Sequence, residues 1–279
     1  MTHHRLLPFT MAAVAVAFFA EYALVSNVNA QAPSKPTAHS ADGRPDLNGT
    51  WDKGGGAAFL RAQRLPGGSV CVIDCPQEPG GPGGRAARAG TQLAPNFPKY
   101  KPEFLARVKD LSDRQVQTDT VLQCQAPGVP RIGPPHKIVQ NAGEVVFLYA
   151  DVNGAFFRII PTDGRPHRKG LPSSYLGDAI GHWEGDTLVI ETVNFNEETW
   201  LIDNGAFHTK DLKVVERLRR VGDTIEYQAT AYDPAVLAEP WITRPRALKL
   251  TDQELEEPDR CEDQDLAHVI DGSHHDNPR

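Results

Sequence analysis

The fold is decided by residues 212–232, which read LKVVERLRRVGDTIEYQATAY. Apolar and polar residues alternate on both sides of a central Val-Gly-Asp turn. Because successive side chains of a strand point to opposite faces of a sheet, this pattern predicts two half-buried strands, 212–220 and 224–232, paired as an antiparallel hairpin.

Glu216 interrupts the apolar face of the first of these strands. It lies in register with Val214 and Leu218, so a carboxylate occupies a position where the pattern requires an apolar side chain. A buried charge is costly unless it is paired, and perturbed charged groups gather at functional sites. The position therefore predicts a polar pocket inside the sheet.

Hairpins of the same form recur along the chain, with Ala-Gly, Asn-Gly and Glu-Gly-Asp turns. Many short antiparallel strands favour a closed or nearly closed barrel, because closure removes exposed strand edges. We expect a mainly β, lipocalin-like barrel with one or two short helices, at 102–111 and 112–115; a two-sheet sandwich is the alternative. The expected strands are a first one near 45–51, followed by 137–141, 144–151, 155–161, 178–183, 187–195, 212–220, 224–232 and 247–250.

The chain divides into four parts by composition. Residues 1–30 are expected to be a signal peptide, 31–45 a polar linker, 46–265 a single barrel-like domain and 266–279 a disordered tail. An irregular extension rich in Gly and Pro lies near the start of the domain, before residue 100.

The first 30 residues resemble a secretory signal in their order of segments. A basic start precedes a mostly apolar stretch, residues 9–25, and the small residues Val28-Asn29-Ala30 fit a cleavage site before Gln31. The alternative is a membrane anchor, but the uninterrupted apolar run is shorter than the roughly 18–20 residues that a span requires. We therefore expect a periplasmic or secreted protein without a stable membrane span.

Charge and motifs limit the classes of partner. The formal net charge is −7, whereas nucleic-acid sites need clustered Lys and Arg, so we expect no nucleic-acid partner. The chain contains no phosphate-binding glycine loop, no Gly-x-Ser-x-Gly sequence and no His-Glu-x-x-His sequence. We expect neither a cofactor nor a bound metal. A metal held by His182, Glu184 and His208 is the alternative, but the expected turn at Glu184 opposes it.

Four cysteines in an exported chain suggest disulfide bonds. Cys71 and Cys75 lie close enough in sequence to close a small loop, which leaves Cys124 to pair with Cys261 across most of the domain. A metal site is an alternative, although the spacings match no common zinc pattern. A redox pair at Cys71 and Cys75 is another, without a thioredoxin-like βαβ pattern to support it.

Five sequence blocks resemble those of a group of exported, largely uncharacterised bacterial proteins. They are PDLNGTW (45–51), DGRPH (163–167), GHWEGDTLVIET (181–192), GAFH (205–208) and VVER (214–217). This resemblance covers most of the mature chain and implies a connection with the breakdown of lignin-derived aromatic compounds. The Gly-x-Trp of the first block is also similar to the start of lipocalins.

The connection between residues 195 and 209 is the leading candidate for a functional loop, because long connections in small domains often form lids or binding segments. It carries Trp200 and Phe207, which we expect to pack against a substrate, and His208, expected to be the general base or acid. Asp203 is near enough in sequence to orient that imidazole, and Glu216 is the alternative orienting carboxylate. The alternatives are that the aromatic residues plug a barrel end and that His208 is a hydrogen-bonded loop histidine.

Other candidates come from the strands. Arg158 lies between Phe156 and Ile160, so it is expected to face the interior and to neutralise Glu216 or stabilise developing negative charge. Tyr149 is expected to contact the substrate, and His182 is a further candidate contact. His167, in the DGRPH block, is expected to be a second acid–base group. The alternatives are a structural Arg158–Glu216 ion pair and a histidine at position 167 that caps a turn.

Two functions from different classes fit these residues. The first is a cofactor-independent lyase or isomerase that uses acid–base chemistry on a small hydrophobic, aromatic compound. The second is a lipocalin-like carrier that binds such a ligand and does no chemistry. Convergence of His208, His167 and Glu216 on one cavity favours the enzyme, whereas a pocket lined by apolar groups favours the carrier. A disulfide-tied envelope protein with a protein partner is a third interpretation, without positive support in the sequence.

Overall fold

The computed structural model describes residues 35–53, 63–64, 70–71, 96–151, 153–258 and 261. The expected signal peptide, the pairing of Cys75 and the expected tail at 266–279 lie outside these residues. Among the described residues, no helix has the length and apolar character needed to cross a membrane.

The hairpin expected around Glu216 is present. It consists of β9 (Lys213–Val221) and β10 (Thr224–Tyr232), which pair antiparallel along their whole length, with Glu216 opposite Ala229. Inward and outward residues alternate on both strands, and Glu216 is completely buried on the inward face. The pattern thus predicted the elements and the burial of the carboxylate.

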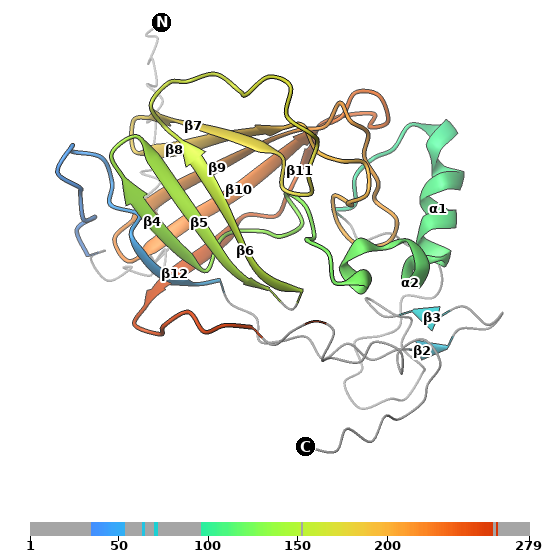
Figure 1. Cartoon of the computed structure of the whole chain (residues 1–279), viewed down its shortest axis with the longest axis horizontal. Helices are drawn as coiled ribbons and strands as arrows, with labels where there is room; N and C mark the ends of the chain where they lie inside the picture. The colour runs from blue at the N-terminus through green and yellow to red at the C-terminus, as the bar shows by residue number, and fades with distance from the viewer. Residues whose placement is uncertain are drawn as a thin grey trace, which may run out of the picture. The chain divides into compact units, whose positions relative to one another are not determined.

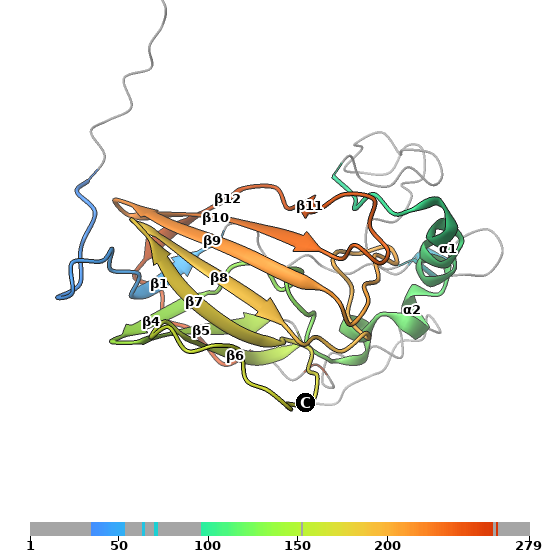
Figure 2. The same ribbon diagram turned by 90° about the horizontal axis from the view of Figure 1, so that it is seen from above.

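The remaining strands extend this hairpin into one sheet. Within the described residues the sheet has ten strands: nine pair antiparallel in the order β6-β5-β4-β1-β12-β10-β9-β8-β7, and the tenth, β11, pairs with β10. The sheet curls into a nearly closed barrel, which confirms the expected fold class (Figures 1 and 2). The other strands are β1 (Gly49–Asp52), β4 (Lys137–Asn141), β5 (Glu144–Asp151), β6 (Gly154–Pro161), β7 (Asp178–Glu184), β8 (Thr187–Val193), β11 (Trp241–Ile242) and β12 (Arg246–Thr251).

The barrel closes at a seam, the line along which β6 and β7 meet. These two strands end the order of the sheet and lie next to each other without pairing. Gly181 on β7 allows the close approach: a Cβ atom there would lie 3.1 Å from Cγ2 of Ile160 and 3.1 Å from Cγ2 of Thr162. A side chain at position 181 would therefore require these two methyl groups to shift by a few tenths of an ångström.

The helices lie together at one end of the barrel (Figures 1 and 2). Pro102 begins the 3₁₀ helix η1 (Pro102–Phe104), a position where its missing N–H costs nothing. The helix α1 (Leu105–Asp113) follows directly, as expected from the sequence. The elements α2 (Gln115–Thr118) and η2 (Thr120–Gln123) complete this end, and a separate two-stranded sheet joins β2 (Gln63–Arg64) to β3 (Val70–Cys71).

The core fills the barrel with side chains from alternate strand positions. On β5, Val145, Phe147 and Tyr149 are all buried, as the sequence pattern predicted. The Glu-Gly-Asp turn between β7 and β8 is also confirmed, since Gly185 has the positive φ of 56° that a tight turn requires and both flanking acids are exposed.

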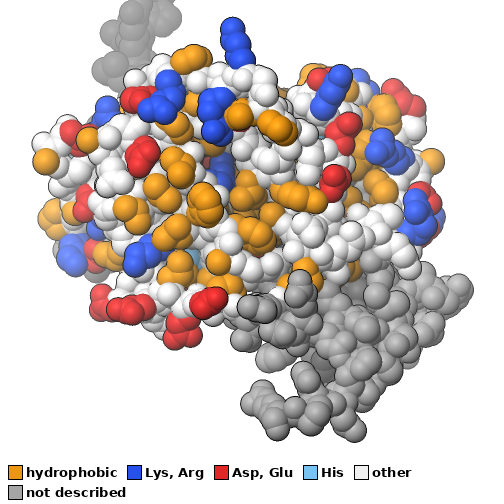
Figure 3. Space-filling view, in the orientation of Figure 1, with side chains coloured by type: hydrophobic (Ala, Val, Ile, Leu, Met, Phe, Trp, Pro, Cys, Tyr) orange, Lys and Arg blue, Asp and Glu red, His pale blue; other side chains and the backbone are white. Residues whose placement is uncertain are grey.

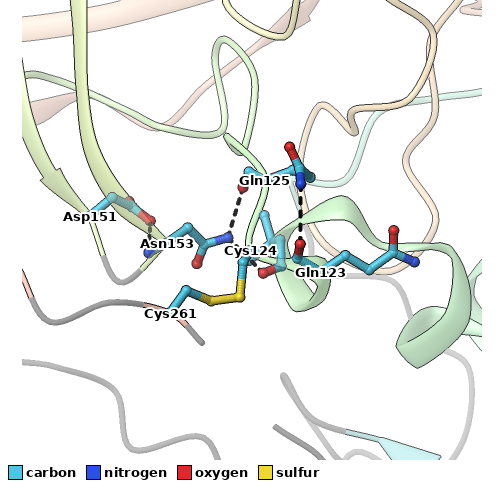
Figure 4. The surroundings of a disulfide bond; sticks show 7 residues. Gln123, Cys124, Gln125, Asp151, Asn153 and Cys261 are labelled. Atoms are coloured by element: carbon cyan, nitrogen blue, oxygen red, sulfur yellow. Dashed lines mark hydrogen bonds between the residues drawn. A yellow bond between two sulfur atoms is a disulfide. The ribbon is translucent and has the colours of Figure 1, made fainter. Parts of the chain in front are cut away.

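A disulfide bond joins Cys124 to Cys261, as expected from the sequence. It fixes the segment after β12 to the end of η2 (Figure 4). Asn153 strengthens the same junction, because its side-chain amide donates to the carbonyl oxygens of Val121 at 2.6 Å and Gln125 at 2.8 Å. The β5–β6 turn, η2 and the C-terminal segment are thereby held together.

Removal of this disulfide by the double change Cys124→Ser/Cys261→Ser is expected to lower the free energy of unfolding by about 2 kcal/mol. The bond closes a loop of 137 residues in the unfolded chain, but in the folded protein it restrains only about ten residues after β12. The difference in loop-closure entropy between these lengths gives the expected value of about 2 kcal/mol. Urea denaturation of the two proteins measures it, and a loss of cooperative folding would contradict the small effect.

Candidate functional site

Five polar side chains meet inside the barrel around Arg158, which lies on β6. Its terminal nitrogens bind Glu216 on β9 in a bidentate ion pair, with Nη1 to Oε1 at 3.0 Å and Nη2 to Oε2 at 2.5 Å. Nη2 also donates to Oγ1 of Thr192 at 2.8 Å, and Nη1 to the hydroxyl of Tyr149 at 3.3 Å. The hydroxyl of Tyr227 donates to Glu216 at 3.0 Å. We call these five residues the interior cluster.

Burial and the pairing of charges together determine the protonation states in this cluster. Burial favours the neutral form of Arg158, but the nearby Glu216 carboxylate outweighs it, so the pKa of Arg158 is raised and the guanidinium stays charged. Burial also raises the pKa of Tyr149 and of Tyr227, which keeps both phenols protonated. The cluster therefore contains one fixed cation paired with one carboxylate, surrounded by neutral hydroxyl groups.

One donor of Arg158 remains unused. A guanidinium carries five N–H groups, and the two terminal nitrogens supply the bonds to Glu216, Thr192 and Tyr149. Nε is buried and has no hydrogen-bond partner within the described part of the chain. Buried donors are almost always satisfied in folded proteins, so this unpaired N–H is unusual.

A cavity of about 600 Å³ opens along the seam and reaches Arg158. One wall comes from β6, a second from β7, and the connection between them and residues 124–126 complete it; we call it the seam cavity. Most of its lining is apolar, and hydrophobic side chains gather over β5 and β6 on this face of the molecule (Figure 3). Its apolar lining includes Phe156, Pro161, Pro166, Leu176, Ala179 and Ile180.

The other charged groups at the seam cavity are also paired. Arg165 donates to Asp163 through three hydrogen bonds. Arg168 donates through Nε to Oδ1 of Asp178 at 2.7 Å. Burial opposes ionisation of Asp178, but the hydrogen bonds from Arg168 and His167 outweigh it and lower its pKa. Each arginine that lines the cavity is thus matched by one carboxylate.

The hydrogen bonds of His208 in the described structure go to two threonines and not to the interior cluster. Its Nδ1 donates to the carbonyl oxygen of Thr209 at 2.9 Å, so Nε2 accepts a hydrogen bond from Oγ1 of Thr199 at 2.8 Å. The side chain is almost fully buried, and burial is the main reason that its pKa is lowered. The imidazole is therefore neutral, with both ring nitrogens bonded to the protein.

Asp203 binds Arg131 instead of orienting His208. The guanidinium of Arg131 makes a bidentate pair with the fully buried Asp119, at 2.7 and 2.8 Å, and also donates to Asp203 at 2.5 and 3.0 Å. The same guanidinium lies 5.7 Å from the ring centre of Trp200. These contacts define a second charged cluster, formed by Arg131, Asp119 and Asp203, between the loop 195–209 and the segment after α2.

Three further residues selected from the sequence lie outside the interior cluster. Phe207 packs against Tyr100 with ring centres 5.2 Å apart, as part of the hydrophobic core. His167 has Nδ1 3.0 Å from Oδ2 of Asp178 and Nε2 3.4 Å from Oε1 of Glu191, which ties the β6–β7 connection to the barrel. His182 is exposed on β7 and lies 3.2 Å from Glu184.

The structure brings together three of the residues selected from the sequence, Arg158, Glu216 and Tyr149. Of all the selected residues, Arg158 alone lines the seam cavity among the described residues. Sequence reasoning missed Thr192 and Tyr227, although strand alternation marks both as inward-facing. It also missed Asp119 and Arg131, for which no periodic signal exists because they lie outside the barrel strands.

Comparisons with protein-family models, curated proteins and solved structures found no match to this chain. The expected relation to exported bacterial proteins therefore stays a prediction.

Proposed function

We propose that the protein is a carrier that binds a small, mainly apolar molecule in the seam cavity. The observation that supports this function is the cavity itself, about 600 Å³ in volume, largely apolar and lined by the buried polar residues Arg158 and Asp178. Binding pockets for small molecules have volumes of about 300–1,000 Å³ and combine apolar walls with a few polar contacts.

The position of the titratable groups favours binding over acid–base catalysis. A general base must have an accessible lone pair within hydrogen-bond reach of the substrate. Both nitrogens of His208 are bonded within the protein, and neither His208 nor Glu216 lines the cavity. Glu216 is held by Arg158 and Tyr227. The three acid–base groups expected from the sequence do not converge on this cavity.

A lyase or isomerase acting on a lignin-derived aromatic compound is the second candidate function. The observation in its favour is the hydrogen bond from His167 to Asp178, because Asp178 lines the cavity and a carboxylate that orients an imidazole is a frequent acid–base arrangement. In such an enzyme His167 acts as the base, and Arg158 stabilises negative charge on the reacting molecule.

Export to the periplasm or the medium is part of the proposal. The disulfide between Cys124 and Cys261 supports it, because disulfides persist mainly in oxidising compartments. A mature chain that begins at Gln31, measured by mass spectrometry of the exported protein, is the expected result, and retention of residues 1–30 would contradict it.

The change Ile180→Trp tests the proposed site. Ile180 is half-buried and lines the seam cavity, so an indole at this position is expected to occupy the space and to weaken binding by about tenfold or more. The probe is N-phenyl-1-naphthylamine, an uncharged fluorescent compound, titrated into parent and variant proteins. Ile242→Trp is the matched control, because Ile242 is an exposed isoleucine on β11 that does not line the cavity.

Two results would contradict the carrier. Equal probe affinity for parent, Ile180→Trp and Ile242→Trp would place the probe elsewhere on the protein. Conversion of lignin-derived aromatic compounds, detected by mass spectrometry after incubation and lost in His167→Ala, would instead establish the enzyme.

A further inference from the structure

The seam cavity combines charge neutrality with one unsatisfied donor, and together these properties define a class of ligand. We propose that the natural ligand is an uncharged apolar molecule with an oxygen acceptor, such as a ketone, aldehyde or ester, which accepts a hydrogen bond from Nε of Arg158. This inference rests on the proposed binding function, which it makes more specific.

The acceptor follows from the hydrogen bonds of Arg158. Its terminal nitrogens already serve Glu216, Thr192 and Tyr149, so a ligand has no reason to compete for them. Nε is the donor of Arg158 that lacks a partner in the described structure, and this residue is 4% exposed and lines the cavity. A ligand without an acceptor leaves this buried N–H unsatisfied, whereas a carbonyl oxygen satisfies it.

The absence of charge on the ligand follows from the ion pairs. The charge of Arg158 is neutralised by Glu216, and the two exposed arginines that line the cavity are also paired, Arg165 with Asp163 and Arg168 with Asp178. A ligand carboxylate placed at Nε would therefore be an extra negative charge near the buried carboxylate of Glu216. Burying such an unbalanced charge is unfavourable, so a neutral acceptor is preferred to a carboxylate.

Three probes of similar size test separately whether the ligand needs an oxygen acceptor and whether it must be uncharged. They are 2-acetylnaphthalene, with a neutral acceptor; 2-ethylnaphthalene, without an acceptor; and 2-naphthoate, with a charged acceptor. Each competes with N-phenyl-1-naphthylamine on the full mature chain. We expect 2-acetylnaphthalene to displace the fluorescent probe at a concentration about tenfold or more below that of the other two, since a hydrogen bond from a charged donor contributes that much to affinity.

The outcomes distinguish the ligand class from the binding function. Equal competition by 2-acetylnaphthalene and 2-ethylnaphthalene would overturn the acceptor while leaving the binding function intact. Strongest competition by 2-naphthoate would overturn the proposal that the ligand is uncharged and would indicate that its acceptor binds Arg165 or Arg168. If the fluorescent probe does not bind, both the function and the ligand class fail.

The double change Arg158→Met/Glu216→Gln tests the donor itself. It removes Nε together with the buried ion pair, so no buried charge is left without a partner. The two probes 2-acetylnaphthalene and 2-ethylnaphthalene are expected to compete equally for this variant. A remaining preference for 2-acetylnaphthalene would overturn Arg158 as the donor. Should this variant not fold, the comparison of the three probes on the parent protein decides the inference.

Discussion

The change Glu216→Gln is expected to lower the free energy of unfolding by about 3–5 kcal/mol. Glu216 is completely buried, and it is the carboxylate that balances the equally buried guanidinium of Arg158. Gln preserves the shape of the side chain and can still accept the hydrogen bond from Tyr227. The expected loss therefore comes from a buried cation without a counter-charge, and urea denaturation of parent and variant measures it.

Two further variants separate charge balance from simple damage to the core. Arg158→Met/Glu216→Gln removes both charges and is expected to regain most of the lost stability, because no buried charge is left without a partner. Glu226→Gln on the adjacent strand β10 is the surface control, with an exposed carboxylate 3.9 Å from Arg219. Its expected effect is below about 0.5 kcal/mol. A loss below about 1 kcal/mol in Glu216→Gln would contradict the pairing.

Arg131→Met is the second change with a large expected effect, again about 3–5 kcal/mol in the free energy of unfolding. Arg131 holds the fully buried Asp119 and the partly buried Asp203, and its side chain is itself almost inaccessible. Its removal leaves two neighbouring carboxylates without a cation. Urea denaturation of parent and variant proteins measures the loss.

Arg114→Met is the matched control for this cluster. Arg114 also forms an ion pair, with Asp110 one helical turn earlier, but more than half of each side chain is exposed. Its removal is expected to change the free energy of unfolding by less than about 0.5 kcal/mol. A similar loss in Arg114→Met and Arg131→Met would argue against buried charge balance as the cause.

The ion pair inside the barrel was predictable because strand alternation is a strong local signal. Arg158 lies on the inward face of β6 and Glu216 on the inward face of β9, and both positions follow from the sequence pattern of their own strands. In a narrow barrel, two inward charges of opposite sign have few other partners. The sequence therefore indicated this pair without any knowledge of the order of the strands.

The partners of the loop residues were not predictable in the same way. Asp203 and His208 are close in sequence, yet Asp203 binds Arg131, which precedes it by 72 residues. Loops lack a repeating pattern that orients side chains, so proximity along the chain gave no information about direction in space. Thr199, whose hydroxyl binds Nε2 of His208, carried no signal that separates it from other threonines, and Nδ1 binds a backbone carbonyl oxygen, that of Thr209.

The seam cavity depends on information that no single segment contains. It forms where β6 and β7 meet without pairing, which is a property of the order of the whole sheet. Local patterns predicted both strands, but they do not indicate which strands lie at the two ends of that order. For this reason the sequence indicated a pocket through Glu216, whereas the cavity opens beside Arg158.

The central claim is that a neutral apolar molecule occupies the seam cavity with its oxygen at Arg158. The most direct measurement is a crystal structure of the mature protein with 2-acetylnaphthalene. We expect the naphthalene rings between β6 and β7, and the ketone oxygen within about 3 Å of Nε of Arg158. A cavity that stays empty at saturating ligand, or a ligand bound elsewhere on the barrel, would contradict the claim.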